Sequence, residues 1–381
     1  CSAAGIDGTV TSGFNVNGVF EVRCFRSIVT TVAGTSLYDY GTIIVDGVGP
    51  AAGLAYVPDL AIDPAGDLWA LDTYDCAIKR ITDLEPGSAN YPFGRVETIY
   101  TSTFCPTSET ADVLDARLGS AYSLTFDRAG DLYVSLNGYI IKITDPGTAE
   151  YQETIFAGSA GQFGNVDGTG EAARFGAIWD IAFGADGNLY VATWVTSTGV
   201  IRMVTPEGVV TSIAGNTTGV RTFVEEGAAL EVDLHKLDGL AIDASGDIFA
   251  SAGSVGRIFK ISDPGEDGSM VTIVAGNSAG TTGYLDGPAL EALFEYNSEP
   301  WIDGAGNLYV ADGGNNRIRK ITAPGTPEAM VTTIAGSGAA GVVDGLATEA
   351  QFDFPEALVG DEFGTLYTAD LYPVAVLRRI G

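Results

Sequence analysis

The chain has 381 residues and is strongly acidic, with 49 Asp and Glu residues against 19 Lys and Arg and a formal net charge of −30. Binding to nucleic-acid phosphates requires clustered Lys and Arg, so this charge disfavours a nucleic-acid partner. A single histidine and four scattered cysteines cannot supply the usual ligand sets of structural or catalytic zinc.

Residues 1–26 precede the first repeat and are expected to form an N-terminal extension. Within them the segment FNVNGVFEV carries Asn17-Gly18 between apolar residues. Asn-Gly favours the type I′ turn of a two-residue hairpin loop. A β-hairpin is therefore predicted in this extension.

A turn-and-strand pattern recurs through the remainder of the chain, residues 27–381, and is clearest in GNLYVADGGNNRIRKIT at 306–322. A constant period of this length is typical of a repeat architecture, and the many glycines and strand-forming residues favour an all-β class. The glycines of the six D-x-x-G-type turns, spaced by 57 to 64 residues, are Gly66, Gly130, Gly187, Gly246, Gly306 and Gly364.

Each repeat is predicted to form four antiparallel strands, and such sheets bury their faces by packing around a ring. The chain ends on VLRRIG, a third strand with no fourth after it, whereas SIVTTVAG near the N-terminus is a fourth strand with no predecessors. The two ends together complete one blade. The sequence thus predicts a six-bladed β-propeller of four-stranded blades, closed by an N-terminal outer strand in the last blade.

The string D-x-x-G-N-L-Y-V-A-D-x-x-N-x-R-I-R-K-I at 303–321 resembles the NHL repeat, and the whole chain resembles bacterial secreted or lipoprotein NHL-repeat proteins. This resemblance implies a propeller with binding on one face. It implies no particular reaction, because function on such folds depends on the site. A site repeated in all six blades is not expected, because Leu136, Thr193 and Ala252 stand where other blades have aspartate.

One face should carry both the loops between the second and third strands and the connections between blades. Loops on a rigid scaffold commonly hold binding residues. The alternative is that the Asp-Gly motifs are only turns in which Asp accepts backbone N–H bonds, and that the lone histidine is an ordinary rim residue. The residues expected on this ligand or partner face are Asp46, Asp72, Asp75, Asp167, Trp194, Glu226, His235, Asp286, Asn315, Asn316 and Asp344.

The favoured function is that of a non-enzymatic, extracytoplasmic binding or scaffold protein, with a protein or glycan partner at the cell surface and no required cofactor. No catalytic residue is assigned, because a Ser or Cys triad would have only His235 as its base. Trp179, Trp194 and Trp301 can stack on sugars or fill blade junctions. The alternative function is a Ca²⁺-dependent hydrolase or lyase with Glu, Asn and Asp at the mouth of the central channel.

The cysteines suggest an oxidising compartment. Cys76 and Cys105 fall on the same face of one blade, which predicts a disulfide; two buried free thiols are the alternative. Cys1, followed by SAAGIDG, resembles the lipid-bearing first residue of mature bacterial lipoproteins. Two other interpretations remain open: a Cys1–Cys24 disulfide, or a position 1 that is merely where this stretch of sequence begins. Membrane attachment is expected only through such a lipidated Cys1.

Overall fold

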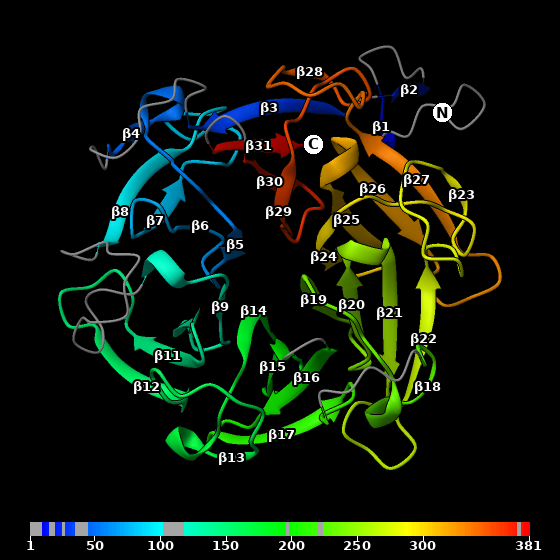
Figure 1. The fold of residues 1–381 in the computed structure, drawn as a ribbon. Coiled ribbons are helices and arrows are strands. Elements are labelled where there is room, and N and C mark those ends of the chain that lie inside the picture. The colour runs from blue at the N-terminus through cyan, green and yellow to red at the C-terminus, as the bar shows by residue number, and fades with distance from the viewer. Residues whose placement is uncertain are drawn as a thin grey trace.

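A ring of six β-sheets makes up the body of the protein (Figure 1). The computed structural model describes residues 27–34, 45–101, 118–195, 198–218, 224–371 and 375–381, and the backbone of 10–14 and 20–24. The innermost strands contact one another in sequence around the centre, and the last contacts the first. The all-β six-bladed propeller predicted from the repeats is confirmed.

Blades 1 to 3 follow one another in chain order, and within each blade the strands run from the rim to the channel as follows. Blade 1 consists of β4 (Gly47–Val48), β8 (Arg95–Thr101), β7 (Ala77–Thr82), β6 (Leu68–Asp72) and β5 (Asp59–Ile62). Blade 2 consists of β12 (Gln152–Gly158), β11 (Tyr139–Thr144), β10 (Leu132–Leu136) and β9 (Leu124–Phe126). Blade 3 consists of β13 (Gly168–Thr169), β17 (Val209–Ala214), β16 (Thr198–Val204), β15 (Leu189–Val195) and β14 (Ala177–Phe183).

Blades 4 to 6 repeat the same order of strands. Blade 4 consists of β18 (Gly227–Ala228), β22 (Met270–Ala275), β21 (Arg257–Ser262), β20 (Ile248–Ala252) and β19 (Gly239–Ile242). Blade 5 consists of β23 (Gly287–Pro288), β27 (Met330–Ala335), β26 (Arg317–Thr322), β25 (Leu308–Asp312) and β24 (Asn297–Ile302). Blade 6 consists of β28 (Gly345–Leu346), β3 (Ile28–Ala33), β31 (Val376–Ile380), β30 (Leu366–Asp370) and β29 (Pro355–Gly360).

Single 3-10 turns lie in the loops between these strands. They are η2 (Gly49–Ala51), η3 (Leu118–Ser120), η4 (Gly170–Ala172), η5 (Ala229–Glu231), η6 (Gly253–Val255) and η7 (Gly313–Asn315). Among the described residues no helix is long and apolar enough to cross a membrane.

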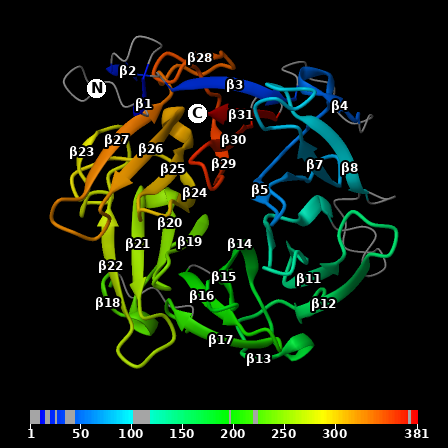
Figure 2. The same ribbon diagram turned by 180° about the vertical axis from the view of Figure 1, so that it is seen from behind.

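The N-terminal strand closes the ring, as the sequence predicts. Strand β3 pairs antiparallel with β31, with Val29 opposite Ile380, and both views show it along the outer side of β31 (Figures 1 and 2). Because the two ends of the chain share one sheet, opening the ring would require breaking this pairing.

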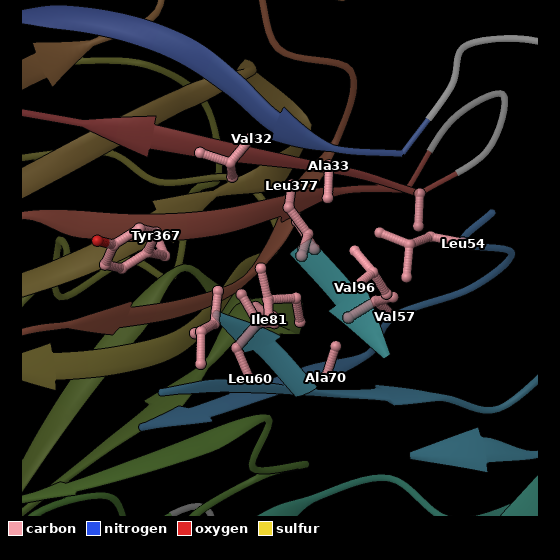
Figure 3. Packing of buried hydrophobic residues seen from close by; sticks show 14 of the residues in the cluster. Val32, Ala33, Leu54, Val57, Leu60, Ala70, Ile81, Val96, Tyr367 and Leu377 are labelled. Carbon is pink, nitrogen blue, oxygen red and sulfur yellow. The ribbon is translucent and has the colours of Figure 1, made fainter. Parts of the chain in front are cut away.

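The hydrophobic core lies between neighbouring blades. At the junction of blades 6 and 1, Val32 and Leu377 pack with Leu60, Ile81 and other buried apolar side chains (Figure 3). Similar clusters fill the other junctions. Burying both faces of every sheet in this way accounts for the near-continuous apolar sequence of the second strands.

The blades differ from the prediction at their rims, where five of the six carry a fifth strand of two residues. The prediction of four strands missed it because the segment is too short to show alternation. This fifth strand is formed by the connection that carries the Asp-Gly motif. The connection pairs with the outer strand of the next blade before the chain continues to the innermost strand of that blade. In blade 2 the corresponding connection, 102–117, lies outside the described residues.

The N-terminal extension contains β1 (Val10–Phe14) and β2 (Phe20–Cys24), which pair antiparallel as a separate two-stranded sheet. This pairing is the one that a hairpin requires. The predicted turn at Asn17-Gly18 lies outside the described residues, so its type stays a prediction.

Replacing Val32 by Ala should lower the free energy of unfolding by about 1–3 kcal/mol, because the side chain is fully buried between blades 6 and 1. Ile28 lies on the same strand with 46% of its surface exposed, so Ile28→Ala should cost less than about 0.5 kcal/mol. Urea denaturation of both variants makes the comparison. Equal losses would show that β3 is not an integral part of blade 6.

Candidate functional site

The carboxylates of the predicted Asp-Gly loops accept hydrogen bonds from the outer strands of the blades. Asp286 accepts a hydrogen bond from the backbone N–H of Thr333 at 3.1 Å and forms an ion pair with Arg319 at 2.7 Å. Asp344 binds Thr31 and Arg378 in the same way, and Asp167 binds Ser212 and Arg202. The equivalent acceptors in blades 1 and 4 are Asp46, bonded to Thr98, and Glu226, bonded to Ile273.

The aspartates at the ends of the second strands are buried and paired with a base on the third strand. Asp312 pairs with Arg319 at 2.5 Å, and both side chains are fully buried. Asp370 with Arg378 and Asp72 with Lys79 repeat the arrangement. Removing one partner of such a pair leaves an uncompensated buried charge. These carboxylates therefore have a structural role in their own blades.

The remaining predicted face residues are dispersed along the rim. Asp75 pairs with Lys79, while Asn315 donates to the Gly283 carbonyl and to Asp312. Trp194 is partly exposed on β15. Asn316 accepts from the N–H of Phe354, and His235 Nε2 lies 2.6 Å from Glu225. The structure does not bring these residues together into one pocket, and whether their face binds a partner stays a prediction.

Cys76 is fully buried, and its Sγ lies 3.5 Å from the Thr73 carbonyl oxygen. Cys76 is not a free thiol. Cys105 and Cys1 lie outside the described residues, so the Cys76–Cys105 pairing and the lipidation of Cys1 stay predictions.

Three carboxyl groups that the face prediction did not include converge at the centre of the ring. Asp59, Asp180 and Glu299 stand at equivalent positions on the innermost strands of blades 1, 3 and 5. Each offers an oxygen within 4.8 Å of the others. In the alternate blades the same position holds Ser123, Gly239 and Ala357.

Each of these carboxylates also joins its blade to the next. Asp59 accepts the backbone N–H of Leu124 at 2.7 Å, Asp180 accepts that of Leu240 at 2.6 Å, and Glu299 accepts that of Leu358 at 3.3 Å. The Ser123 hydroxyl donates to Asp180 at 2.8 Å. The cluster is therefore anchored by backbone donors of the blades between its members.

The carboxyl groups of the cluster have raised pKa values. Burial, with the neighbouring Asp180 charge, raises the pKa of Asp59 to about 7, and burial raises the pKa of Asp180 to about 6. The pKa of Glu299 lies well above its usual range because the group is buried beside Asp59 and Asp180. No ion pair to any of the three exists in the described part of the chain, so protons or a bound cation must balance their charge.

A cavity of about 220 Å³ is lined by these three acidic residues and by the aromatic residues Tyr122, Trp179, Tyr296 and Phe354. Trp179, named from the sequence as a sugar-stacking or junction residue, lies here, whereas Trp301 packs in the junction of blades 5 and 6. Tyr296 and Phe354 hold φ angles of 51° and 58°, which are strained for aromatic residues. Strain of this kind is concentrated at functional sites.

Two polar groups line the same cavity at the ends of the connections into blades 4 and 6. The Lys236 ammonium lies 3.6 Å from the centre of the Trp179 ring and 2.8 Å from Asp238. Glu356 is a further, half-buried acid, and desolvation with the nearby Asp238 charge raises its pKa to about 7. The cavity therefore combines aromatic faces with an excess of carboxyl groups, and we refer to it as the channel-mouth pocket.

A larger cavity, of about 460 Å³, lies on the opposite face between blades 2 and 3 and is lined by Tyr133, Phe156 and Phe183. Its lysine, Lys142, is already paired with Asp131 at 2.7 Å. It lacks the converging, unpaired carboxyl groups of the channel mouth, which is therefore the stronger candidate site.

Neither a family model nor a curated protein matches the sequence, so the NHL-repeat resemblance is not confirmed at that level. Solved structures confirm the propeller. An auxiliary nutrient binding protein from Bacteroides thetaiotaomicron is 18% identical, with 97% of this chain and 82% of that chain covered and a TM-score of 0.63. One of the same description from Bacteroides ovatus is 17% identical, with the same coverage and a TM-score of 0.65.

Enzymes share the architecture as well. A gluconolactonase from Xanthomonas campestris is 12% identical, with 86% of each chain covered and a TM-score of 0.52. At such identities the likeness shows the fold alone, and function has to be argued from the site.

The pKa shifts at the channel mouth predict a protein that is more stable in mild acid. A carboxyl group whose pKa is higher in the folded state stabilises the fold at low pH, and that contribution is lost as the pH rises through the folded pKa. With pKa values that rise from 3.8 to about 7 for Asp59 and to about 6 for Asp180, the urea midpoint should fall as the pH rises from about 4 to about 7.

The variant Glu299→Gln measures how much of this pH dependence of stability comes from the carboxyl cluster. The amide mimics the protonated carboxyl, so the variant should be more stable than the unmodified protein at pH 8 and should show a shallower pH slope. Glu150→Gln, at an exposed position, serves as the control and should leave the slope unchanged. A steeper slope in Glu299→Gln would contradict the assignment.

Proposed function

We propose that this protein is a non-enzymatic binding protein that takes a carbohydrate into the channel-mouth pocket. The observation that carries the proposal is the meeting of aromatic faces and buried carboxyl groups in one cavity. Aromatic rings bind the apolar face of a sugar, while a few well-placed polar groups accept its hydroxyl hydrogens and fix its orientation.

The size of the pocket limits what it can hold. At about 220 Å³ it is smaller than the ~300–1,000 Å³ typical of drug-sized ligands. It suits a single ring rather than an enclosed oligosaccharide. A glycan would therefore place one terminal sugar in the pocket, and its other sugars would lie over the loop face of the propeller.

The wider setting of the proposal is extracytoplasmic, at a cell surface, with Cys1 as the point of lipid attachment and a protein partner on the same loop face. The auxiliary nutrient binding proteins of similar fold support a binding role. The location and the lipid are proposals that rest on the sequence.

A second function is favoured by the carboxyl cluster itself: a Ca²⁺-dependent hydrolase or lyase at the channel mouth. Ca²⁺ prefers carboxylate and carbonyl oxygens, and Asp59, Asp180 and Glu299 present three such oxygens within 4.8 Å. Since Ca²⁺ takes about 6–8 ligands, water or substrate would supply the others. The gluconolactonase of similar fold is in keeping with this alternative.

Carbohydrate binding should depend on Trp179. On a glycan array, followed by calorimetry with the best ligand, Trp179→Ala should weaken binding about 10- to 100-fold, because an aromatic side chain that a ligand covers and desolvates contributes strongly to affinity. Phe363→Ala removes an aromatic ring that is 74% exposed in a D-x-x-G turn of the opposite face, so it should have no effect. Equal losses in both variants would place the ligand elsewhere.

The metal-dependent alternative makes a separate prediction. If Ca²⁺ binds the cluster, millimolar CaCl₂ should raise the melting temperature of the unmodified protein, since a ligand that binds only the folded state stabilises it. The increase should vanish in Glu299→Gln and persist in Glu150→Gln. An identical increase in both variants would rule out the cluster as the Ca²⁺ site.

A further inference from the structure

Among the side chains that line the channel-mouth pocket, hydrogen-bond acceptors outnumber donors, and acidic groups outnumber basic ones. Five of its lining residues carry carboxyl groups, and one carries an ammonium group. The acids are Asp59, Asp180, Asp238, Glu299 and Glu356. A ligand that donates hydrogen bonds and carries positive charge would balance this excess, whereas an anionic ligand would be repelled.

The protein places one cation of its own against this surface. The Lys236 ammonium stacks over the Trp179 ring at 3.6 Å and pairs with Asp238 at 2.8 Å. A cation over an indole face is attracted by the ring quadrupole, and more strongly so when desolvated. The pocket therefore already contains an aromatic-and-carboxylate position that is occupied by an amine.

A further acceptor in the pocket lacks a partner. Asn297 is fully buried and lines the cavity, and its Nδ2 donates to the Arg257 carbonyl at 3.3 Å. That bond leaves the Oδ1 as the remaining acceptor, and no described residue donates to it. Buried acceptors without a partner are costly, so a donor from a water molecule or from a ligand group that enters the cavity would stabilise this atom.

We propose that the ligand is an amino sugar with a free, protonated amino group, bound with its ammonium toward Glu356, Asn297 and the carboxyl cluster and its ring against the aromatic residues. This inference rests on the proposed function and specifies the class of its ligand. The Lys236 ammonium then competes with the ligand ammonium for the same aromatic and carboxylate groups. N-acetylation would remove the charge and leave the carboxylates uncompensated.

Uptake of this ligand should release protons. Asp59, Asp180, Glu299 and Glu356 face the pocket from β5, β14, β24 and β29, and all four have raised pKa values caused by burial. Lys236 and Asp238 face them from the connection into β19, and Tyr56 donates to Glu356 at 3.4 Å. A bound ammonium favours the ionised carboxylates, so protons leave as it enters.

Calorimetry on the full chain with glucosamine, N-acetylglucosamine and glucose tests the inference. At pH 7, in two buffers of different ionisation enthalpy, glucosamine should bind at least about tenfold more tightly than the other two, with net proton release. Equal or tighter binding of glucose or N-acetylglucosamine would overturn the inference and leave carbohydrate binding intact. If none of the three binds, the inference fails, and the glycan array tests the proposed function separately.

Two variants locate the effect. Glu356→Gln should lower the affinity for glucosamine about tenfold and the affinity for glucose much less, while Glu362→Gln, exposed on the opposite face, should change neither. Lys236→Met should raise the affinity for glucosamine several-fold by removing the resident cation. An unchanged preference in Glu356→Gln, or a lower glucosamine affinity in Lys236→Met, would contradict the assignment.

Discussion

Closing six sheets into one ring brings one position of each innermost strand toward a common axis. At that axis Asp59, Asp180 and Glu299 meet within 4.8 Å, although they are far apart in the sequence. Backbone N–H groups of the neighbouring blades hold the three carboxyl groups in place. The closed ring thus brings together three carboxyl groups that no short segment could place side by side. Their burial and proximity raise their pKa values.

The acidic residues of the chain have different roles at the rim and at the channel mouth. At the rim, Asp286 and Asp312 both pair with the buried Arg319, and Asp286 also accepts a hydrogen bond from Thr333 on β27, so their charges are neutralised within the blade. At the channel mouth Asp59, Asp180 and Glu299 form no ion pair with any residue in the described part of the chain. Charges paired inside a blade stabilise its geometry, whereas unpaired charges in a cavity are available to a ligand.

The fold could be predicted because its determinants are repeated: turns, strand lengths and the basic third strand recur in every blade. The same repetition directed the site prediction to the rim loops. Asp286 and Asp344 attracted attention as members of a series, yet a series is what folding requires. The residues of the channel mouth escaped notice because Asp59, Asp180 and Glu299 alternate with Ser123, Gly239 and Ala357 at one strand position. An acidic residue seven positions before the turn glycine, as in blades 1, 3 and 5, was the available signal, but the convergence of the three side chains requires the closed ring.

The central claim is that the unrepeated channel-mouth residues, rather than the repeated rim carboxylates, bind the ligand. A crystal structure of the protein with its tightest-binding sugar tests this most directly. The account predicts one sugar ring between Trp179 and Glu356, with the rim pair of Asp286 and Arg319 undisturbed. A sugar bound across the rim loops, with the channel mouth unchanged, would contradict it.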